Sequence, residues 1–150
     1  MHSSIEKIRG IAADWGADVI FVQAVNQLLE GPLRHKPAKQ PNDLEVFFVE
    51  RANAGDIEGL MALYEPNAMV ANGDREVTIG LDQIREYLVR LLESCPQLEP
   101  SEQAPALCSG DLALTSSRLR NGDITAEVAR RQPDGNWLWV IDQFVLGRAV

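Results

Sequence analysis

Two carboxylates near the C-terminus, Glu127 and Asp142, are the residues best placed for acid–base chemistry. If Asp134-Gly135 closes the last hairpin, these two residues oppose each other on neighbouring strands. Directly opposed residues have Cβ atoms about 5 Å apart, and two ionised carboxylates at that distance repel each other. We therefore expect one of them to keep a proton near neutral pH, or Arg118 to neutralise the pair.

The strand before this hairpin joins the same sheet through a predicted two-residue turn at Asn121-Gly122. In that register Arg118 opposes Thr125, and Ser116 opposes Glu127. The face that carries the two carboxylates then consists of Leu114, Ser116, Arg118, Thr125, Glu127, Ala129, Leu138, Val140, Asp142 and Phe144. The opposite face consists of Ile124, Ala126, Val128, Arg130, Trp137, Trp139, Ile141 and Gln143. A β-bulge in either hairpin would reverse part of this assignment.

Two interpretations of the Glu127–Asp142 pair are open. It is either a solvated or arginine-paired group of charges, or the polar end of an otherwise apolar cavity. Trp137 and Trp139, assigned to the outer face, indicate a covered surface such as a dimer interface. Arg130 would oppose Trp139 there, either in a cation–π contact or as an ordinary cross-strand pair.

Other kinds of site have little support in the sequence. The histidines are His2, at the terminus, and His35, in a proline-rich stretch, so we expect neither a Ser-His-Asp triad nor a histidine metal site. Cys95 and Cys108 lack metal-site spacing, and we expect two reduced thiols. There is no glycine-rich phosphate loop, so we expect no cofactor and no metal.

The composition indicates one globular domain without a nucleic-acid or membrane partner. The 150 residues include 22 acidic and 14 basic ones, and the net charge of −8 disfavours a phosphate-backbone partner. The longest apolar run, Val19 to Val22, is too short to cross a membrane. Charged residues between Glu6 and Asp14 leave no apolar signal-peptide core, so we expect a cytoplasmic protein.

Residues 1–30 repeat apolar side chains at helical spacing, and Gly31-Pro32 ends the pattern. Prolines and lysines between residues 34 and 41 indicate a linker. We therefore expect a helical N-terminal arm and linker over residues 1–41, followed by a domain over residues 42–150. The arm packs either on its own domain or on a partner subunit.

The domain is expected to begin with helices and to end with strands. The expected helices cover residues 42–55, 56–66 and 80–92, with short strands over 68–72 and 76–79. Asn42 and Glu45 have the spacing of a capping box, and Asp56 can cap the second helix. Four further strands are expected over 104–109, 112–119, 124–132 and 137–146. Helices followed by antiparallel strands are typical of an α+β fold in which the helices cover one face of a curved sheet.

Several short motifs follow one another in a familiar order. They are Ala54-Gly55-Asp56, then Leu63-Tyr64-Glu65-Pro66-Asn67-Ala68, then Gly80 opening a helix with Ile84, and finally Asp134-Gly135-Asn136-Trp137. Together they resemble the nuclear-transport-factor-2-like superfamily, and within it the SnoaL-like and ketosteroid-isomerase-like proteins. The resemblance covers roughly residues 42–146.

The resemblance implies a cone-shaped fold of the cystatin-like kind. A curved mixed sheet would pack on three helices, with an apolar cavity at its open end. Members are commonly homodimers through the outer face of the sheet. The superfamily includes enzymes, binding proteins and assembly modules, so the fold by itself says little about function.

The resemblance to ketosteroid isomerases also marks individual positions. Those enzymes combine a carboxylate base with a phenol and a protonated acid. The protonated-acid position falls on Glu127, the base position on Asn72 and the phenol position on Phe48. Because Asn72 cannot accept a proton and Phe48 has no hydroxyl, we do not expect the isomerase reaction itself. Tyr64 and Tyr87 fall on pocket-lining positions, but both also fit a plain core role.

Two hypotheses about function follow. In the first, a homodimer binds a small, largely apolar molecule in its cone, and Asp142 and Glu127 are the catalytic acid–base pair of a proton transfer such as an isomerisation, cyclisation or dehydration. The expected ligand-binding residues are Phe48, Tyr64, Asn72, Tyr87, Ser116, Arg118 and Val140. In the second, the protein is a non-catalytic association module that contacts its partner through the helical arm.

Overall fold

The structure is a computed structural model that describes residues 35–74 and 76–148. The chain divides into two units, residues 1–36 and 37–150, and all that follows concerns the second. The predicted helical arm over residues 1–30 lies outside the described residues. None of the described helices is long and apolar enough to cross a membrane.

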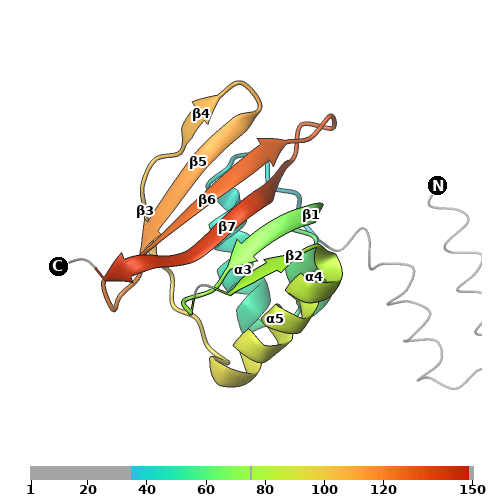
Figure 1. The fold of residues 1–150 in the computed structure, drawn as a ribbon. Coiled ribbons are helices and arrows are strands. Elements are labelled where there is room, and N and C mark those ends of the chain that lie inside the picture. The colour runs from blue at the N-terminus through green and yellow to red at the C-terminus, as the bar shows by residue number, and fades with distance from the viewer. Residues whose placement is uncertain (1–34, 75, 149–150) are drawn as a thin grey trace, which may run out of the picture. The chain divides into compact units, whose positions relative to one another are not determined.

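The described chain folds into a curved mixed sheet with helices against one face (Figure 1), so the predicted α+β class is confirmed. The helices are α3 (Asp43–Asn53), α4 (Ile57–Met61) and α5 (Leu81–Ser94). The strands are β1 (Tyr64–Ala71), β2 (Val77–Ile79), β3 (Glu102–Gln103), β4 (Leu107–Ser109), β5 (Leu112–Arg118), β6 (Asp123–Arg131) and β7 (Trp137–Arg148). They form one sheet in the order β2-β1-β7-β6-β5-β3, and β4 pairs with β5.

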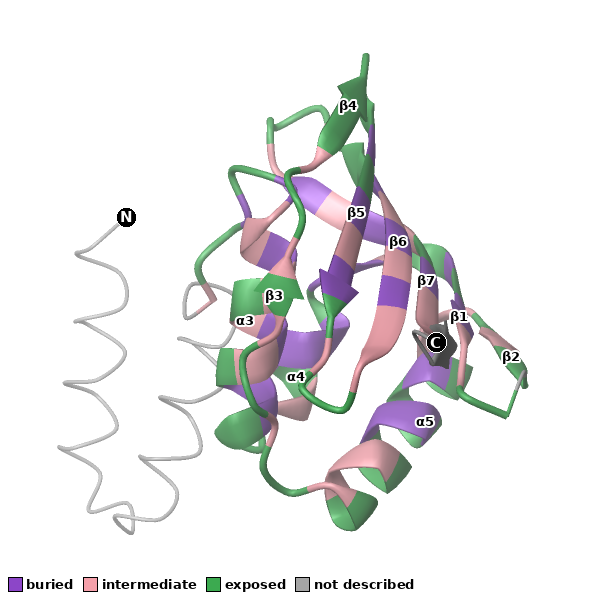
Figure 2. Ribbon diagram, turned by 90° about the vertical axis from the view of Figure 1, so that its left-hand side faces the viewer, coloured by how far each residue is buried: buried purple, intermediate pink, exposed green. Residues whose placement is uncertain are grey.

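The core lies between α3, α5 and the concave face of the sheet. Leu44, Leu60, Ile84 and Leu88 are fully buried there, and Figure 2 shows the purple residues gathered on the parts of the helices and strands that face one another. Ala38, in the stretch predicted as a linker, is also buried in this core. Ile84 and Leu88 lie on the apolar side of α5, so this side of the amphipathic helix packs against the sheet, as its helical periodicity predicts.

The second helix is shorter than predicted. Asp56 caps it as expected, because its carboxylate accepts a hydrogen bond from the Gly59 amide at 2.9 Å. The helix ends at Met61 rather than at Pro66, and Tyr64 already begins β1. Tyr64 is paired in parallel with Trp139 of β7, so contact with a distant strand determines the conformation here.

The predicted capping box at Asn42 and Glu45 is wrong. The Asn42 amide nitrogen donates to Ala104 O at 3.1 Å, and its oxygen accepts from the Ala106 amide at 3.1 Å. The strand expected over 104–109 is shorter than predicted, since only Leu107–Ser109 forms β4, and β3 lies before the expected range. Glu45 is released from a capping role and faces the interior of the cone.

The hairpin between β5 and β6 differs from the prediction by one residue. Its loop has three residues, Arg120 to Gly122, because Leu119 N donates to Asp123 O at 2.8 Å and Gly122 takes a positive φ of 87°. Ser117 therefore opposes Thr125, and Thr115 opposes Glu127. Since side chains alternate between faces, this single-residue shift moves Ser116 and Arg118 to the outer face.

The hairpin between β6 and β7 also has a three-residue loop, which ends at Gly135, and places Arg131 opposite Trp137. A β-bulge at Val140 then restores the predicted register, because Ala129 opposes Trp139 while Val128 opposes Ile141. Glu127 and Asp142 are opposed as predicted. The bulge also turns Trp137 and Trp139 inward, where both are buried, so their assignment to the outer face is wrong.

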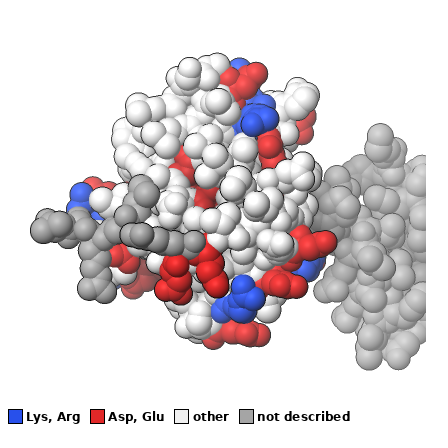
Figure 3. All heavy atoms as spheres, in the orientation of Figure 1, with Lys and Arg blue, Asp and Glu red and all other residues white. Residues whose placement is uncertain are grey.

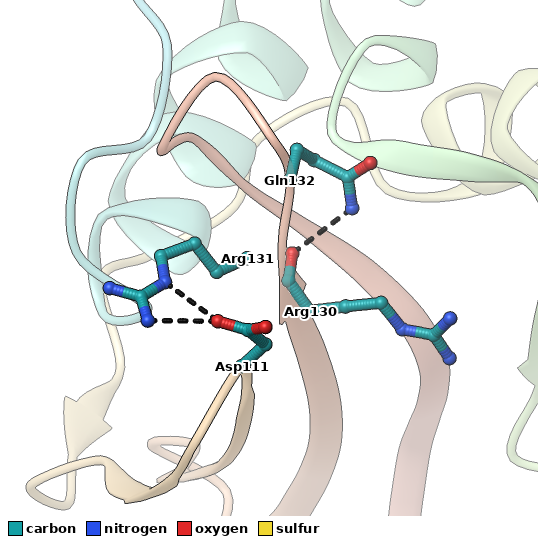
Figure 4. A network of polar contacts seen from close by, with 4 residues as sticks. All are labelled: Asp111, Arg130, Arg131 and Gln132. Carbon is teal, nitrogen blue, oxygen red and sulfur yellow. Dashed lines mark hydrogen bonds and ion pairs between the residues drawn. The ribbon is translucent and has the colours of Figure 1, made fainter.

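Polar contacts connect the end of β6 to the turn before β5 (Figure 4). The Arg131 guanidinium donates to the Asp111 carboxylate at 2.8 and 3.0 Å, and it lies 5.9 Å from the centre of the Trp137 ring. Gln132 donates to Arg130 O at 3.2 Å. The predicted partner of Trp139, Arg130, is instead paired with Leu138.

The loop conformation at Gly135 yields a stability prediction. Its φ is +86°, and a Cβ built there meets no atom within 4 Å. A side chain at this position would therefore cause no steric clash with its neighbours, and its only cost is the conformational energy of a positive φ. We expect Gly135→Ala to lower the free energy of unfolding by about 1–2 kcal/mol. Gly73→Ala is the matched control, because that site is equally open but has no positive φ. Urea unfolding of both variants measures the difference, and equal effects would contradict the prediction.

Candidate functional site

A cavity of about 280 Å³ opens between α3, the end of α5 and the concave face of the sheet. Most of its wall is aromatic or aliphatic, with Phe48, Trp139 and Phe144 as the aromatic members. Its polar groups include the carboxyl groups of Glu45, Glu127 and Asp142. A largely apolar pocket with a few converging polar groups is the usual form of a small-molecule site.

The sheet register brings Glu127 and Asp142 together on the wall of this cavity. They are directly opposed on β6 and β7, and each side chain is only 4% exposed. The bulge at Val140 is essential to this placement, since it puts Trp139 and Asp142 on the same face although they are three residues apart. The interpretation as a solvated surface pair is therefore wrong.

Glu127 is held by a hydroxyl group of the neighbouring strand. Thr115 Oγ1 donates to its carboxylate at 2.7 Å. Burial raises the pKa of Glu127 to about 8, with the negative charge of Asp142 adding to the effect and the hydroxyl groups of Thr125 and Thr115 opposing it. Glu127 is therefore mostly protonated at neutral pH.

Asp142 is held by the phenol of Tyr64 on the other side of β7. The Tyr64 hydroxyl donates to Asp142 Oδ2 at 2.7 Å. Burial raises the pKa of Asp142 to about 7, and the Tyr64 hydrogen bond opposes the rise because it stabilises the ionised form. Together the two carboxyl groups hold between one and two protons near neutral pH, in line with the expectation that one of them stays protonated.

Arg118 takes no part in this charge balance. It lies on the outer face opposite Ile124 and Glu102, next to Ser116, in a shallow surface pocket that both residues line. The prediction that Arg118 neutralises the pair is wrong, because the three-residue loop at Gly122 turned it away. The same shift removes Ser116 from the cavity.

Two other expected ligand-binding residues also lie elsewhere. Asn72 shapes the turn between β1 and β2, where its side-chain oxygen accepts from the Asp74 and Glu76 amides at 3.0 and 2.9 Å. Val140 is the bulge residue of β7 and is absent from the cavity wall. Neither side chain is placed to contact a molecule in the cone.

Of the aromatic residues expected to bind a ligand, only Phe48 lines the cavity, whereas Tyr64 and Tyr87 have the core role that was the alternative. Phe48 lines the cavity, with its ring centre 5.8 Å from that of Trp139 and 6.4 Å from that of Phe144. Tyr87 on α5 packs edge-on against Phe144 at 6.3 Å. Burial raises the pKa of Tyr87, and the negative charge of Asp142 adds to that rise. Tyr64 and Tyr87 thus support the site from behind its wall.

Glu45 is one of the site residues that the sequence analysis missed, and Thr115 and Trp139 are others. Glu45 faces the cavity from α3 and accepts a hydrogen bond from the Ser101 hydroxyl at 2.8 Å. Burial raises its pKa, and the Ser101 bond opposes the rise. The signal was its spacing from Phe48, since residues three apart share one face of a helix.

Two polar atoms beside the cavity have no hydrogen-bond partner among the described residues. They are the Thr125 hydroxyl and the Trp139 indole nitrogen. Both atoms are buried, and both residues line the cavity. A buried polar group without a partner is costly, so such groups usually indicate a bound water or ligand. Within residues 35–74 and 76–148, no three His, Cys, Asp or Glu side chains form a group that could hold a metal ion.

Solved structures with the same fold include proteins of several kinds. A proposed dehydratase of the nuclear-transport-factor-2-like family from Streptomyces avermitilis is 17% identical, with a TM-score of 0.58 over 71% of this chain and 92% of that one. A ketosteroid isomerase-like protein from Erwinia carotovora atroseptica is 17% identical, with a TM-score of 0.55 over 68% and 89%. A proposed calcium/calmodulin-dependent protein kinase type II association domain from Thiobacillus denitrificans is 13% identical, with a TM-score of 0.62 over 73% and 94%.

At these identities the likeness establishes the fold alone, and the cone-shaped cystatin-like fold expected from the sequence is confirmed. No curated protein matches the chain. Residues 47–147 match the model of one protein family along most of the described domain, including all of β6 and all but the last residue of β7, the strands that carry the carboxyl pair. The chain belongs to the SnoaL-like domain family.

Proposed function

We propose that this protein binds a small, largely apolar molecule in its cone and catalyses a proton transfer there. The observation that carries the proposal is the buried Glu127–Asp142 pair, which forms part of the wall of an apolar cavity. Two carboxyl groups with pKa values of about 8 and about 7 can present one acid and one base at neutral pH.

The two carboxyl groups have different surroundings, which suggests different roles. Asp142 accepts the Tyr64 hydrogen bond and has the lower pKa, so it is the base that takes a proton from the ligand. Glu127 has the higher pKa and is the acid that gives a proton to a ligand oxygen. An isomerisation, cyclisation or dehydration needs both steps, and general acid–base catalysis typically contributes about 10²–10⁴ in rate.

The site differs from that of a ketosteroid isomerase as the family pattern describes it. Phe48 provides a ring but no hydroxyl on the cavity wall, and Asn72 is occupied in a turn. Tyr64 supplies a phenol from β1, but its hydrogen bond goes to Asp142 rather than towards a ligand. We therefore place the reaction class with proton transfer in general and not with steroid isomerisation.

The raised pKa values predict that stability falls as pH rises. The ordinary pKa values, 3.8 for Asp142 and 4.5 for Glu127, apply when unfolding exposes these groups. Between about pH 4 and pH 8 the native state then binds more protons than the unfolded state, so the free energy of unfolding decreases with pH. We expect a loss on the order of a few kcal/mol that levels off above about pH 8.

Urea unfolding between pH 5 and pH 9 measures this slope. Glu127→Gln should flatten it and should be more stable than the wild type at pH 8.5, because the variant buries no second negative charge. Glu86→Gln, an exposed change on α5, is the matched control and should keep the slope. Stability that does not fall between pH 5 and pH 8 would show that the two carboxyl groups hold no extra protons in the native state.

Proton transfer can be detected before the product is known. Apolar ketones, lactones and amino ketones are incubated with the protein in D₂O, and mass spectrometry reads deuterium incorporated at carbon. We expect Asp142→Asn to slow incorporation by about a hundredfold or more, because an amide cannot accept the proton. Asp82→Asn, an exposed carboxylate-to-amide change on α5, should leave the rate unchanged.

Tyr64→Phe separates a role in the chemistry from a role in folding. It removes the hydrogen bond that lowers the pKa of Asp142, so the pH of half-maximal exchange should rise. An exchange rate that is unchanged in Asp142→Asn would disprove its role as the base. If the ketones, lactones or amino ketones bind but no deuterium is exchanged, the protein binds ligands and does not catalyse this proton transfer.

A second candidate function, association, rests on the outer face of the sheet. An apolar row crosses six strands in register there, each member paired with the next: Ile79, Met69, Ile141, Val128, Leu114 and Leu107. All of them except Val128 are well exposed. Residues other than Lys, Arg, Asp and Glu also cover most of the upper part of the face that is visible in Figure 3. A contiguous apolar face of this kind is typical of a protein interface, and we propose that it joins two copies of the chain.

Ile141→Lys tests this interface. It places a charge in the middle of the row on the face opposite the cavity, so we expect it to convert dimers to monomers in analytical ultracentrifugation while ligand binding persists. Val89→Lys is the matched control, since Val89 is 38% exposed on α5 and lies off the sheet. A monomeric wild-type protein, or equal effects of the two variants, would exclude this dimer.

A further inference from the structure

The cavity has an unbalanced charge. Four of its lining residues carry carboxyl groups, and none of the described lining residues is Lys, Arg or His. Glu99 forms an exposed ion pair with Arg120, and the distance from Arg120 Nε to the Glu99 carboxylate is 3.1 Å. The other three carboxyl groups, those of Glu45, Glu127 and Asp142, each accept a hydrogen bond from a neutral hydroxyl group.

These three groups come from different elements and act on one another. Glu45 faces the cavity from α3, Glu127 from β6 and Asp142 from β7. The negative charge of Glu45 adds to the rise in the pKa of both Glu127 and Asp142. The other titratable groups packed around them include Tyr64 on β1 and Tyr87 on α5, which are neutral at physiological pH as phenols ordinarily are, and burial raises their pKa values further. No described group therefore offsets the negative charge inside the cone.

The rest of the wall suits a hydrocarbon with one polar end. Phe48, Trp139 and Phe144 form an aromatic surface whose ring faces attract cations as well as apolar groups. Thr125 also lines the cavity, and its buried hydroxyl has no hydrogen bond of ordinary length to the described residues, although it lies close enough to Glu127 to lower the pKa of that carboxyl group. That oxygen can accept a hydrogen bond from a ligand donor.

We propose that the natural ligand of the cavity is an apolar amine, bound as its ammonium ion between Glu45 and the Glu127–Asp142 pair. Its hydrocarbon part packs on the aromatic wall, and its N–H groups donate to the carboxylates. A buried carboxylate is stable only when it is paired with a cation or hydrogen-bonded, and the ammonium supplies the missing cation. A neutral isostere gains the same apolar contacts without this pairing, and an anion is repelled.

This inference names the ligand class of the proposed proton-transfer site and rests on that proposal for its catalytic consequence. An ammonium beside Glu45 cancels the repulsion that this residue exerts on Asp142, so the substrate itself would ionise the base. Binding should then release protons to the solvent. The number released depends on pH and should be largest near neutral pH, where the pair is partly protonated.

Three probes with the same hydrocarbon cage and different charges test the inference. They are 1-adamantanamine, 1-adamantanol and 1-adamantanecarboxylate, titrated into the full chain by isothermal calorimetry at pH 7. We expect the amine to bind at least tenfold more tightly than the alcohol, and the carboxylate most weakly. Repeating the amine titration in phosphate and in HEPES, which differ in ionisation enthalpy, should reveal net proton release for the amine and none for the alcohol.

Variants show whether the carboxyl groups cause the preference. Glu45→Gln should reduce the amine-to-alcohol ratio about tenfold while the affinity for the alcohol stays the same, which shows that the cavity is intact. Glu86→Gln removes an equal charge from exposed α5 and should leave the ratio unchanged. Equal reduction by the two variants would mean that only the overall negative field attracts the amine, and the inference would be wrong.

The possible results separate this inference from the proposed function. Equal affinities for amine and alcohol, preference for the carboxylate, or no binding of any probe at millimolar concentration would each overturn the amine assignment. In that case, deuterium exchange into neutral carbonyl compounds would still support the proposed proton transfer. Conversely, a clear amine preference without exchange in any compound would uphold the ligand class and remove the proton transfer.

Discussion

Two carboxyl groups are buried side by side in this domain with no Lys, Arg or His among the described residues that line their cavity, and much of the surrounding structure serves to make that arrangement stable. Neighbouring hydroxyl groups, from Thr115 and Tyr64, donate to the pair. Burial keeps part of the population protonated, which avoids two adjacent negative charges in an apolar surrounding. The cost of such a pair in free energy is understandable if function requires it, because active sites commonly retain groups that a purely structural core would replace.

The prediction that Glu127 opposes Asp142 is correct, although it rests on two errors in the strand register that cancel each other. The loop ending at Gly135 has one residue more than assumed, and the bulge at Val140 shifts the register back by one before Asp142 is reached. The loop ending at Gly122 has the same extra residue, but β5 has no bulge to compensate. Arg118 and Ser116 were therefore assigned to the wrong face. Asn-Gly fits both loop lengths, so local turn chemistry could not decide between them.

The remaining errors arise where a distant contact outweighs a local pattern. The spacing of Asn42 and Glu45 fits a capping box, but Asn42 binds the backbone near Ala104 and Glu45 faces the cavity. Likewise Pro66 suggested the end of a helix, whereas parallel pairing with β7 draws Tyr64 into a strand. Helix and strand types followed from periodicity, and the overall fold from the order of motifs. The position of each polar side chain depended on contacts that periodicity does not encode.

The hydrogen bond between Tyr64 and Asp142 has a further consequence for how the domain folds. The two residues are 78 positions apart, and the strands that carry them pair in parallel, so α5 and five other strands lie between them in the chain. The hairpin of β6 and β7 can form from local contacts, but closing β1 against β7 requires ordering a long intervening segment. Glu127 and Asp142 can therefore meet early in folding while still exposed to water and ionised. Their pKa values rise only when β1 and the helices close the cone, so completion of the fold is itself a step that takes up protons.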